Sequence, residues 1–438
     1  MTHLTSLDEL KRHITLLVSV EESDALFVSF YLNLEDGGAL GRAALAQRAS
    51  VLRHILKGND LADLERALYK INAYLAAEIL PEAKGLAIFV RDAFGGAFLL
   101  PMQFAVPVPN WIVVYPTPNI YHLVELKDTY HRYVVLLATS ERARILDVNL
   151  GAATVQAWID RPELRGLVGE GWSRSHYQVH RANRGERFLE EKLAVLEQLM
   201  RAGGHAHLIL AGDPEITAGV RRALPKDLAD KLVDTIPASA RDKQTDVVMA
   251  TLSSFIEHEE QESQAIAERL VEGLRGQDLA VVGSAAALDA LRRGNVDTLV
   301  MAQGYQPDHG WTCAACKAMG TDVPETPVCP QCDQASVRPL DVKEALLRLA
   351  GQFECPVEVV EQTDALMALG GVGCLLRARR EAGNGRTGPH PRPRPPMRGE
   401  TSTVLSDPSV GVAREMARAS AQARPRNDFR AVDSAKDG

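Results

Sequence analysis

Four cysteines in two pairs are the residues of this sequence whose spacing implies chemistry most directly. Cys313 and Cys316 form one C-x-x-C pair, and Cys329 and Cys332 form a second, with twelve residues between the pairs. Two such pairs on tight turns supply four thiolates, the tetrahedral sulfur set that zinc prefers. Four thiolates leave no open position on the ion, so the predicted zinc is structural. The insert that carries them, residues 311–337, would draw much of its folding free energy from the metal.

A basic and aromatic segment, residues 171–184, is the second chemically distinctive feature. Between Trp172 and Arg184 it contains three Arg, two His, one Trp and one Tyr, and no acidic residue. Guanidinium groups bind phosphates, and aromatic rings stack on unpaired bases. We predict that this segment is a loop that binds RNA through a set of polar and aromatic residues: Trp172, Ser173, Arg174, His176, Tyr177, Gln178, His180, Arg181 and Arg184.

Two other interpretations of the same segment stay open. The aromatic residues could pack beneath the helix that follows, which would make the segment an ordinary solvated loop. Alternatively, Ser173, His176 and His180, with Asp147 or Glu170, could act as nucleophile, base and orienting acid of a hydrolase. A catalytic triad is defined by geometry and not by local spacing, so the sequence does not decide between them.

Charge and length bound the remaining function classes. A chain of 438 residues is too long for one core and suits several domains. Residues 1–380 carry 39 basic and 50 acidic side chains, a net charge of −11, so any RNA contact must be local. The N-terminus lacks a secretory signal, and no apolar run approaches the roughly 18 residues of a membrane span. We therefore expect a cytoplasmic protein with no membrane partner, and the residues predict no small-molecule substrate.

The hydrophobic pattern predicts a multidomain α/β protein. Residues 1–129 form an N-terminal α/β domain with strands at 25–32, 85–90 and 96–100, a long helical region at 40–77, and a Pro-rich edge or linker at 101–118. Residues 130–275 form a middle domain. Its predicted elements are strands at 133–139, 144–149, 153–159 and 207–211, an irregular segment at 161–183, a helix that begins at Asn183 and ends at Gly203, and a helix at 247–274.

The last two regions differ sharply in pattern. Residues 276–380 alternate strands with helices, which predicts a mixed α/β domain: an apolar segment at 279–282, strands at 298–302, 357–360 and 373–377, and helices at 285–293 and 342–351. Residues 381–438 have no such periodicity. Their Pro-rich run at 389–396 cannot pack as helix or sheet, so we predict a disordered tail.

The third region resembles the C-terminal domain of class-one release factors and Pelota. The residues that carry the resemblance are the helix that ends in Gly294-Asn295-Val296-Asp297-Thr298-Leu299, the strand at 357–360, and the glycine-rich ending at 369–377. With the middle region, they resemble the bacterial branch of the archaeo-eukaryotic release factors, the Pelota-like and Balon-like ribosome factors. The resemblance implies a ribonuclease H-like middle domain and a C-terminal domain like the kink-turn RNA-binding proteins, with a zinc-ribbon insert.

The same resemblance implies a function on the ribosome, with one departure. It implies binding to rRNA in the decoding (A) site, with elongation factor Tu as a candidate delivery partner. However, the chain has no Gly-Gly-Gln release motif and no Asn-Ile-Lys-Ser stop-codon motif, and Gln178 follows the bulky Tyr177. We therefore expect a factor of hibernation, stress protection or stalled-ribosome recognition that has no catalytic residues.

Two alternatives to that function remain. The chain could be a peptidyl-tRNA hydrolase, ribosome-rescue release enzyme or ribonuclease that uses residues 171–184. It could also be a zinc-stabilised scaffold that binds a protein partner through its acidic surface.

Overall fold

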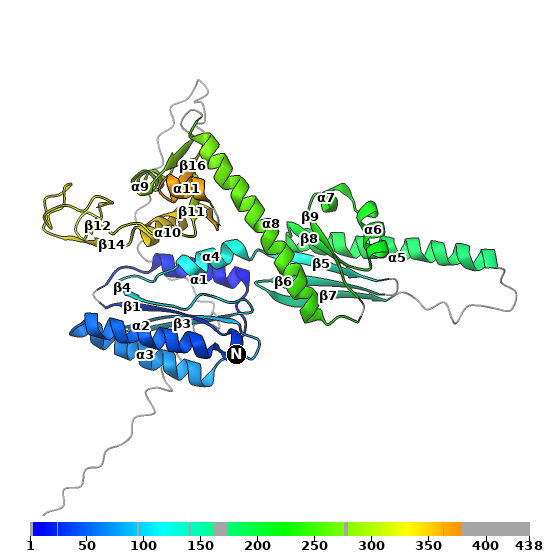
Figure 1. Ribbon diagram of the computed structural model, residues 1–438, viewed down its shortest axis with the longest axis horizontal. Coiled ribbons are helices and arrows are strands. Elements are labelled where there is room, and N and C mark those ends of the chain that lie inside the picture. The colour runs from blue at the N-terminus through cyan, green and yellow to red at the C-terminus, as the bar shows by residue number, and fades with distance from the viewer. Residues whose placement is uncertain are drawn as a thin grey trace, which may run out of the picture. The chain divides into compact units, whose positions relative to one another are not determined.

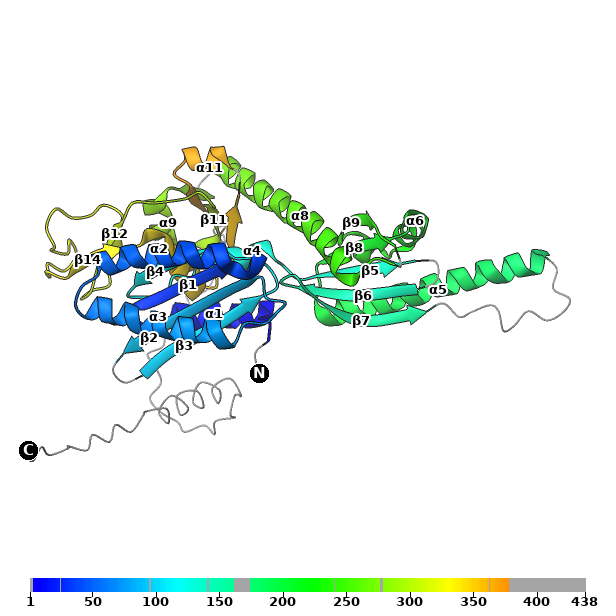
Figure 2. The same ribbon diagram turned by 60° about the horizontal axis from the view of Figure 1, so that its bottom comes forward.

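The computed structural model describes residues 3–23, 25–93, 96–139, 142–160, 174–239, 241–275, 279–361 and 363–377. Met1–Ala378 form one compact unit, which contains three large sheets with helices packed on them and one small sheet (Figures 1 and 2). The predicted multidomain α/β class is confirmed. Each predicted domain contains one large sheet, although the division itself stays a prediction. The predicted disordered tail, 381–438, lies outside the described residues.

The first sheet has the strand order β3-β2-β1-β4. Its strands are β1 (Phe27–Asn33), β2 (Gly85–Ala93), β3 (Gly96–Phe104) and β4 (Trp111–Tyr115), and all its pairs are antiparallel. Successive residues of a strand face opposite sides of the sheet. Val28, Phe30 and Leu32 accordingly pack with α2 (Ala39–Ile55) and α3 (Asn59–Ala77), whereas Phe27 and Tyr31 pack with α1 (Leu7–Ser19) and α4 (Tyr121–Thr129).

The structure refines two predictions for this region. The predicted helical region at 40–77 consists of two helices, because Gly58 has φ +59°, a conformation that glycine adopts readily and that ends regular helix. Of the two interpretations of residues 101–118, an edge or a linker, the edge is confirmed, because β3 continues to Phe104 and β4 pairs with β1. Helix α4 and the short 3₁₀ helix η1 (Glu35–Gly38) were not predicted.

The middle sheet has the order β7-β6-β5-β8-β9. Strands β5 (Tyr133–Ala138), β6 (Arg142–Asn149) and β7 (Ala152–Asp160) pair antiparallel, while β8 (His207–Gly212) runs parallel to β5 and to β9 (Leu232–Pro237). One face packs with α5 (Arg174–Gly203), α6 (Pro214–Ala223) and α7 (Lys226–Ala229). The other face packs with α8 (Gln244–Gly273). No described helix combines the length and the apolar character needed to cross a membrane.

The third sheet has the order β10-β16-β11-β15, and only β11 and β15 are parallel among its described pairs. The strands are β10 (Ala280–Val282), β11 (Val296–Ala302), β15 (Val357–Val360) and β16 (Val372–Leu376). The helices are α9 (Ser284–Arg292), α10 (Val342–Gln352) and α11 (Asp364–Ala368). Gly294, with φ +67°, makes the predicted turn between α9 and β11. A small sheet of β12 (Gly310–Cys313), β13 (Met319–Gly320) and β14 (Val337–Leu340) is inserted before α10.

Two side chains of α10 cap helices that lie far away in the sequence. The buried carboxylate of Glu344 accepts hydrogen bonds from the N–H groups of Ile120 (2.9 Å) and Tyr121 (3.0 Å), at the start of α4. The guanidinium of Arg348 donates to the carbonyls of Leu17 (3.1 Å) and Val18 (2.9 Å) at the end of α1. Each side chain supplies hydrogen bonds that the backbone of that helix end lacks, so α10 holds both helices against the third sheet.

Candidate functional site

The four predicted ligands lie together in the small sheet and its loops. Sγ of Cys313 is 3.6 Å from Sγ of Cys332, and Sγ of Cys316 is 3.6 Å from Sγ of Cys329. All four sulfur atoms lie within 4.8 Å of one another. A disulfide would bring two sulfurs to about 2.05 Å. Four thiolates at about 2.3 Å from one zinc ion would lie about 3.8 Å apart in tetrahedral geometry, so the observed spacing fits a shared metal.

Two equivalent turns bring the sulfurs together. Cys313 N–H donates to the carbonyl of Ala318 (2.8 Å), and Lys317 N–H donates back to the carbonyl of Cys313 (2.9 Å). The second turn repeats this pattern from Cys329, with Gln334 as acceptor (2.9 Å) and Asp333 as donor (3.0 Å). Lys317 and Asp333 occupy the same place in their turns, and both have positive φ, +59° and +55°. The chain thus adopts the strained turn twice, at the two points where a thiolate pair is required.

The chemistry of the donor set also suits a metal. The N–H of Cys316 and the hydroxyl of Ser336, whose oxygen lies 3.1 Å from the sulfur, lower the pKa of the Cys313 thiol to about 6. Despite a hydrogen bond from the N–H of Gln334, burial and the neighbouring thiols raise the pKa of Cys332 to about 12. A thiolate is the form that binds metal. The apolar core beneath the site is small: Trp311, Cys313, Ala318 and Cys329 are its buried members. The residues therefore fit a metal ion that closes this insert.

The other two cysteines are separate from this centre. Cys355 and Cys374 are 7 % and 0 % exposed, within the core of the third sheet. Burial raises the pKa of Cys355 to about 11 and that of Cys374 to about 12. These thiols stay protonated near neutral pH and behave as core residues.

The basic aromatic segment is mostly helix, which corrects the predicted loop at 171–184. Helix α5 begins at Arg174, nine residues before the predicted start at Asn183. No Gly or Pro occurs between Arg174 and Arg184, and Arg, Gln and Ala favour helix. Trp172 and Ser173 lie outside the described residues, and so do the side chains of Arg174, His176, Tyr177, Gln178, His180, Arg181 and Arg184. Their predicted RNA-binding role stays a prediction.

One acid of the hydrolase interpretation has a structural partner. Asp147 on β6 is buried and accepts a hydrogen bond from Nε of Arg132 at 2.9 Å. The ion pair with Arg132 explains why a carboxylate is buried at this position, and no catalytic role is needed to explain it. The alternative acid, Glu170, lies outside the described residues.

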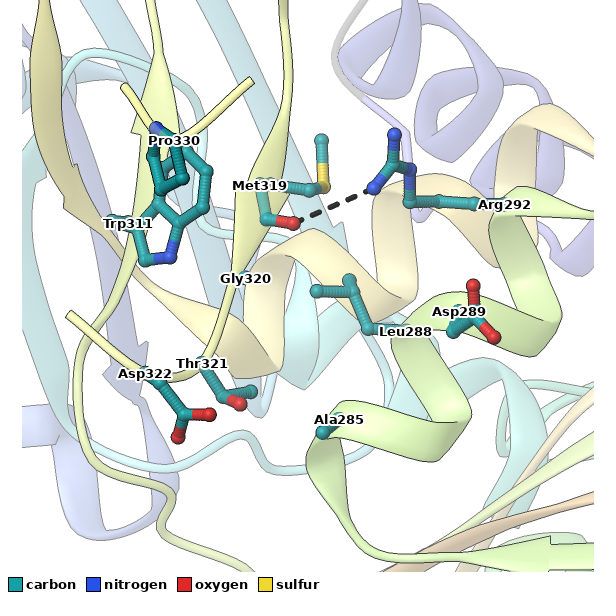
Figure 3. A pocket seen from close by; sticks show the side chains of 10 residues that line it. All are labelled: Ala285, Leu288, Asp289, Arg292, Trp311, Met319, Gly320, Thr321, Asp322 and Pro330. Carbon is teal, nitrogen blue, oxygen red and sulfur yellow. Dashed lines mark hydrogen bonds between the residues drawn. The ribbon is translucent and has the colours of Figure 1, made fainter. Parts of the chain in front are cut away.

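A shallow groove lies between α9 and the four-cysteine insert (Figure 3). Its volume is about 350 Å³, and Arg292 and Trp311 line it from opposite sides. Nη1 of Arg292 donates to the carbonyl of Met319 at 3.5 Å, which ties the insert to α9. The groove therefore lies at the contact that attaches the insert to α9. None of the predicted site residues lines it.

A second group of potential metal ligands was missed by the sequence analysis. His207 begins β8, and His258 and Glu262 stand on α8; one ligand atom of each lies within 4.8 Å of the others. The signal in the sequence was the pair His258 and Glu262, four residues apart on a predicted helix and thus on one face. Such a pair is common on exposed helices, and only the fold adds His207.

The middle of the chain matches a known protein family. Residues 118–255 match the model of bacterial archaeo-eukaryotic release factor family 10, a match that spans less than half of the chain. The predicted resemblance to the bacterial branch of the archaeo-eukaryotic release factors is thereby confirmed for this segment. No curated protein matches the chain.

Solved structures similar to this chain include two archaeal Pelota proteins and one domain of a peptide chain release factor. Pelota from Archaeoglobus fulgidus is 12 % identical, with a TM-score of 0.34, over 86 % of this chain and 93 % of that one. Pelota from Thermoplasma acidophilum is 12 % identical, with a TM-score of 0.25, over 86 % and 95 %. The C-terminal domain of a peptide chain release factor from Methanosarcina mazei is 19 % identical, with a TM-score of 0.25, over 32 % and 98 %.

Proposed function

We propose, from the match of residues 118–255 to bacterial archaeo-eukaryotic release factor family 10, that this protein is a translation factor that binds the ribosome in the region of the decoding (A) site. Its role is in hibernation, stress protection or stalled-ribosome recognition, and peptide release is not part of it. The family match is the observation that carries the proposal.

The start of α5 supplies the RNA contact in this proposal. Arg174, Tyr177, Arg181 and Arg184 recur at intervals of three and four residues, the spacing of positions on one side of a helix. A row of guanidinium groups with an aromatic ring suits rRNA phosphates and an unpaired base. In Figures 1 and 2 the first turns of α5 extend past the ends of the strands of the middle sheet. The body of the chain is acidic, so binding depends on this local cluster.

The absence of a Gly-Gly-Gln sequence supports a factor without release activity. In that motif, two glycines let the backbone approach the ester of peptidyl-tRNA closely. In this chain His176 and Tyr177 stand before Gln178, where the motif has its two glycines. A residue that carries a side chain cannot bring its backbone as close to the ester as glycine can.

Zinc is the metal of the four-cysteine centre in this proposal. Cys313, Cys316, Cys329 and Cys332 would hold it, and a fully sulfur-ligated ion supplies folding energy and no open position for chemistry. The metal would make the insert rigid, and the hydrogen bond from Arg292 would hold it beside α9. Elongation factor Tu is retained as a candidate delivery partner.

A triple variant tests the RNA contact. Arg174→Ala with Arg181→Ala and Arg184→Ala is expected to lower co-sedimentation with ribosomes at least about tenfold. Each lost phosphate contact also lowers the salt slope of binding by about 0.7–0.9. The matched control replaces three exposed arginines elsewhere in the middle region, Arg221, Arg222 and Arg241, which removes the same net charge. Equal loss in both variants, or loss in neither, would refute the assignment to α5.

A release assay separates this proposal from an enzyme. Ribosomes that carry labelled peptidyl-tRNA are incubated with the purified protein and with its Gln178→Ala variant. The proposal predicts no release above background with either protein. Peptide release that is lost in Gln178→Ala would show a peptidyl-tRNA hydrolase instead.

A further inference from the structure

Histidines and glutamates cluster where α8 crosses the first residues of β5 and β8. One face of α8 carries Val248, Thr251, Phe255, His258 and Glu262, at alternating intervals of three and four residues. The first three pack against the middle sheet: Val248 and Phe255 are core residues, and Thr251 Oγ1 lies 3.2 Å from Tyr133 Oη. The next two positions of the same face are therefore directed along the same side of the helix, toward the start of β8.

Strand register brings the third residue to the same place. Tyr133, the first residue of β5, is paired with His207, the first residue of β8. The ring of Phe255 on α8 stacks on Tyr133 with centroids 4.5 Å apart and lies 5.3 Å from the ring of His207. The ring of His207 in turn lies 5.9 Å from that of His258. A packed aromatic group thus fixes His207 against the α8 face that carries the other two residues.

We propose that His207, His258 and Glu262 form a second metal site, for a divalent transition-metal ion such as Zn²⁺. Two imidazoles and one carboxylate are a donor set that binds zinc with a position left open for water or an external ligand. His258 Nε2 lies 3.4 Å from Glu262 Oε1. Two ligands at about 2.1 Å from a tetrahedral ion are separated by about 3.4 Å. All three ligand atoms lie within 4.8 Å, so closure around an ion needs small side-chain movements.

The surroundings supply the hydrogen bond that a metal-binding histidine requires. Glu259 Oε1 lies 3.6 Å from His207 Nδ1, and both atoms are buried without a hydrogen-bond partner. The other oxygen of Glu259 accepts a hydrogen bond from His131 Nδ1 at 2.7 Å. On metal binding, a small rotation lets Glu259 accept the Nδ1–H of His207, which leaves Nε2 to bind the ion. This carboxylate–histidine–metal arrangement orients the ring.

The exposure of the three ligands rises from His207 to His258 to Glu262, which opens the site to solvent on one side. The side chains of His207, His258 and Glu262 are 18 %, 31 % and 56 % exposed. An ion can therefore enter past Glu262 and reach two imidazoles held by the core. Next to the site, Ser263 on α8 donates to the carboxylate of Glu358 on β15 at 3.2 Å. A bound ion would brace α8 against β8 immediately before its contact with the third sheet.

Zinc stoichiometry of the full chain tests the site. The protein is dialysed against buffered Zn²⁺, and bound zinc is measured by atomic emission. The wild type is expected to hold two ions per chain, one of them in the four-cysteine centre. Glu262→Gln and His258→Ala are each expected to hold one, with the second affinity weakened at least about 100-fold. Glu268→Gln, an exposed glutamate on the same helix, is the matched control and should hold two.

Cobalt substitution identifies which ion is lost. Co²⁺ in the four-cysteine centre gives intense thiolate-to-metal charge-transfer absorption, whereas a His and Glu site gives only weak ligand-field bands. The charge-transfer bands should persist in Glu262→Gln while the weak bands disappear. Glu259→Gln should keep both sets but weaken the second affinity about 10- to 100-fold. One zinc per wild-type chain, or two in both Glu262→Gln and His258→Ala, would overturn the proposal.

Discussion

The four-cysteine centre and the His207, His258 and Glu262 cluster place potential metal ligands on opposite kinds of scaffold. The cysteines stand on two tight turns over a small core of Trp311 and Ala318, beside strands of two to four residues. The second cluster stands on a long helix and a central strand, whose aromatic core is complete beneath it. In the first region the ligands must create the structure, whereas in the second the structure creates the ligand set.

This difference separates two consequences of metal binding. Where little apolar surface is buried, the free energy of binding is mostly free energy of folding. Where a core already exists, binding adds to stability only by mass action and leaves the fold intact. The four predictions that follow test this contrast, from the largest expected effect to the smallest.

Removal of metal should unfold the insert and nothing else. Apparent binding free energies of structural zinc are about 10–16 kcal/mol, far more than the small core here can replace. With a strong chelator, the amides of Cys313 and Cys329, which are hydrogen-bonded in the two turns, should exchange at least about 100-fold faster. Amides of β5 and β8 should remain protected, because the core beneath the second cluster is complete without metal. Hydrogen exchange read by mass spectrometry would contradict the contrast if the insert stayed protected.

Cysteine substitutions should divide by location. Cys329→Ser removes a buried thiolate of the centre, so we expect it to lose one zinc ion and unfold the insert. Cys355→Ser removes a buried thiol from the core of the third sheet and is the matched control. It should lower the free energy of unfolding by about 1–3 kcal/mol and leave zinc content unchanged. Zinc analysis and urea unfolding of both variants supply the measurement. Loss of zinc in Cys355→Ser, or unchanged zinc content in Cys329→Ser, would contradict this division.

The side chains of α10 that cap α1 and α4 connect distant elements without any metal, which makes them a reference for the two metal sites. Burial raises the pKa of Glu344 to about 8 from its ordinary 4.5, so the folded chain keeps a proton that the unfolded chain releases in this range. This contribution to stability is complete below about pH 4.5 and is lost as the pH rises toward 8. Relative to Glu344→Gln, the wild type should lose about 1.4 kcal/mol per pH unit in that window.

Glu268→Gln, on the exposed side of α8, is the control for that titration and should follow the wild type. Urea unfolding at several pH values, with zinc held constant, supplies the measurement. A difference between wild type and Glu344→Gln that does not change with pH would show that this carboxylate is ionised in the folded protein.

The smallest effect is expected at the second cluster. Without metal, Glu262→Gln should change the free energy of unfolding by less than about 0.5 kcal/mol, because the side chain is largely exposed. At zinc concentrations 100 times the dissociation constant of this site, the wild type should gain about 2.7 kcal/mol that the variant does not. Thermal unfolding with and without zinc measures both. A large loss in the metal-free variant would mean that this cluster also creates its own structure.

Local patterns in the sequence predicted most strands and the four-cysteine centre. The apolar residues of Phe27–Asn33 and Tyr133–Ala138 predicted their strands, because both strands are buried on both faces of their sheets and such strands are apolar almost throughout. The two C-x-x-C pairs are a complete ligand set within twenty residues, so no fold was needed to assemble it.

What the sequence could not supply depended on distant partners. Strand β4 and helix α4 carry weak local signals and are held by β1 and by Glu344, 224 residues away from Ile120. The start of α5 was placed too late because Asn183 has the spacing of a cap, yet nothing before it breaks the helix. His207 could join His258 and Glu262 only through the register of β5 with β8. Tertiary contacts decided each of these cases.

Sucrose-gradient sedimentation of the purified wild-type chain with ribosomes, at low and at moderate salt, is the most direct test of the proposed function. We expect the protein to sediment with intact ribosomes at low salt and to be partly released as the salt concentration rises, because a local cluster of arginines makes the contact. Absence of the protein from every ribosomal fraction at low salt would contradict a ribosomal function and leave the fold and the two proposed metal sites to be explained by another role.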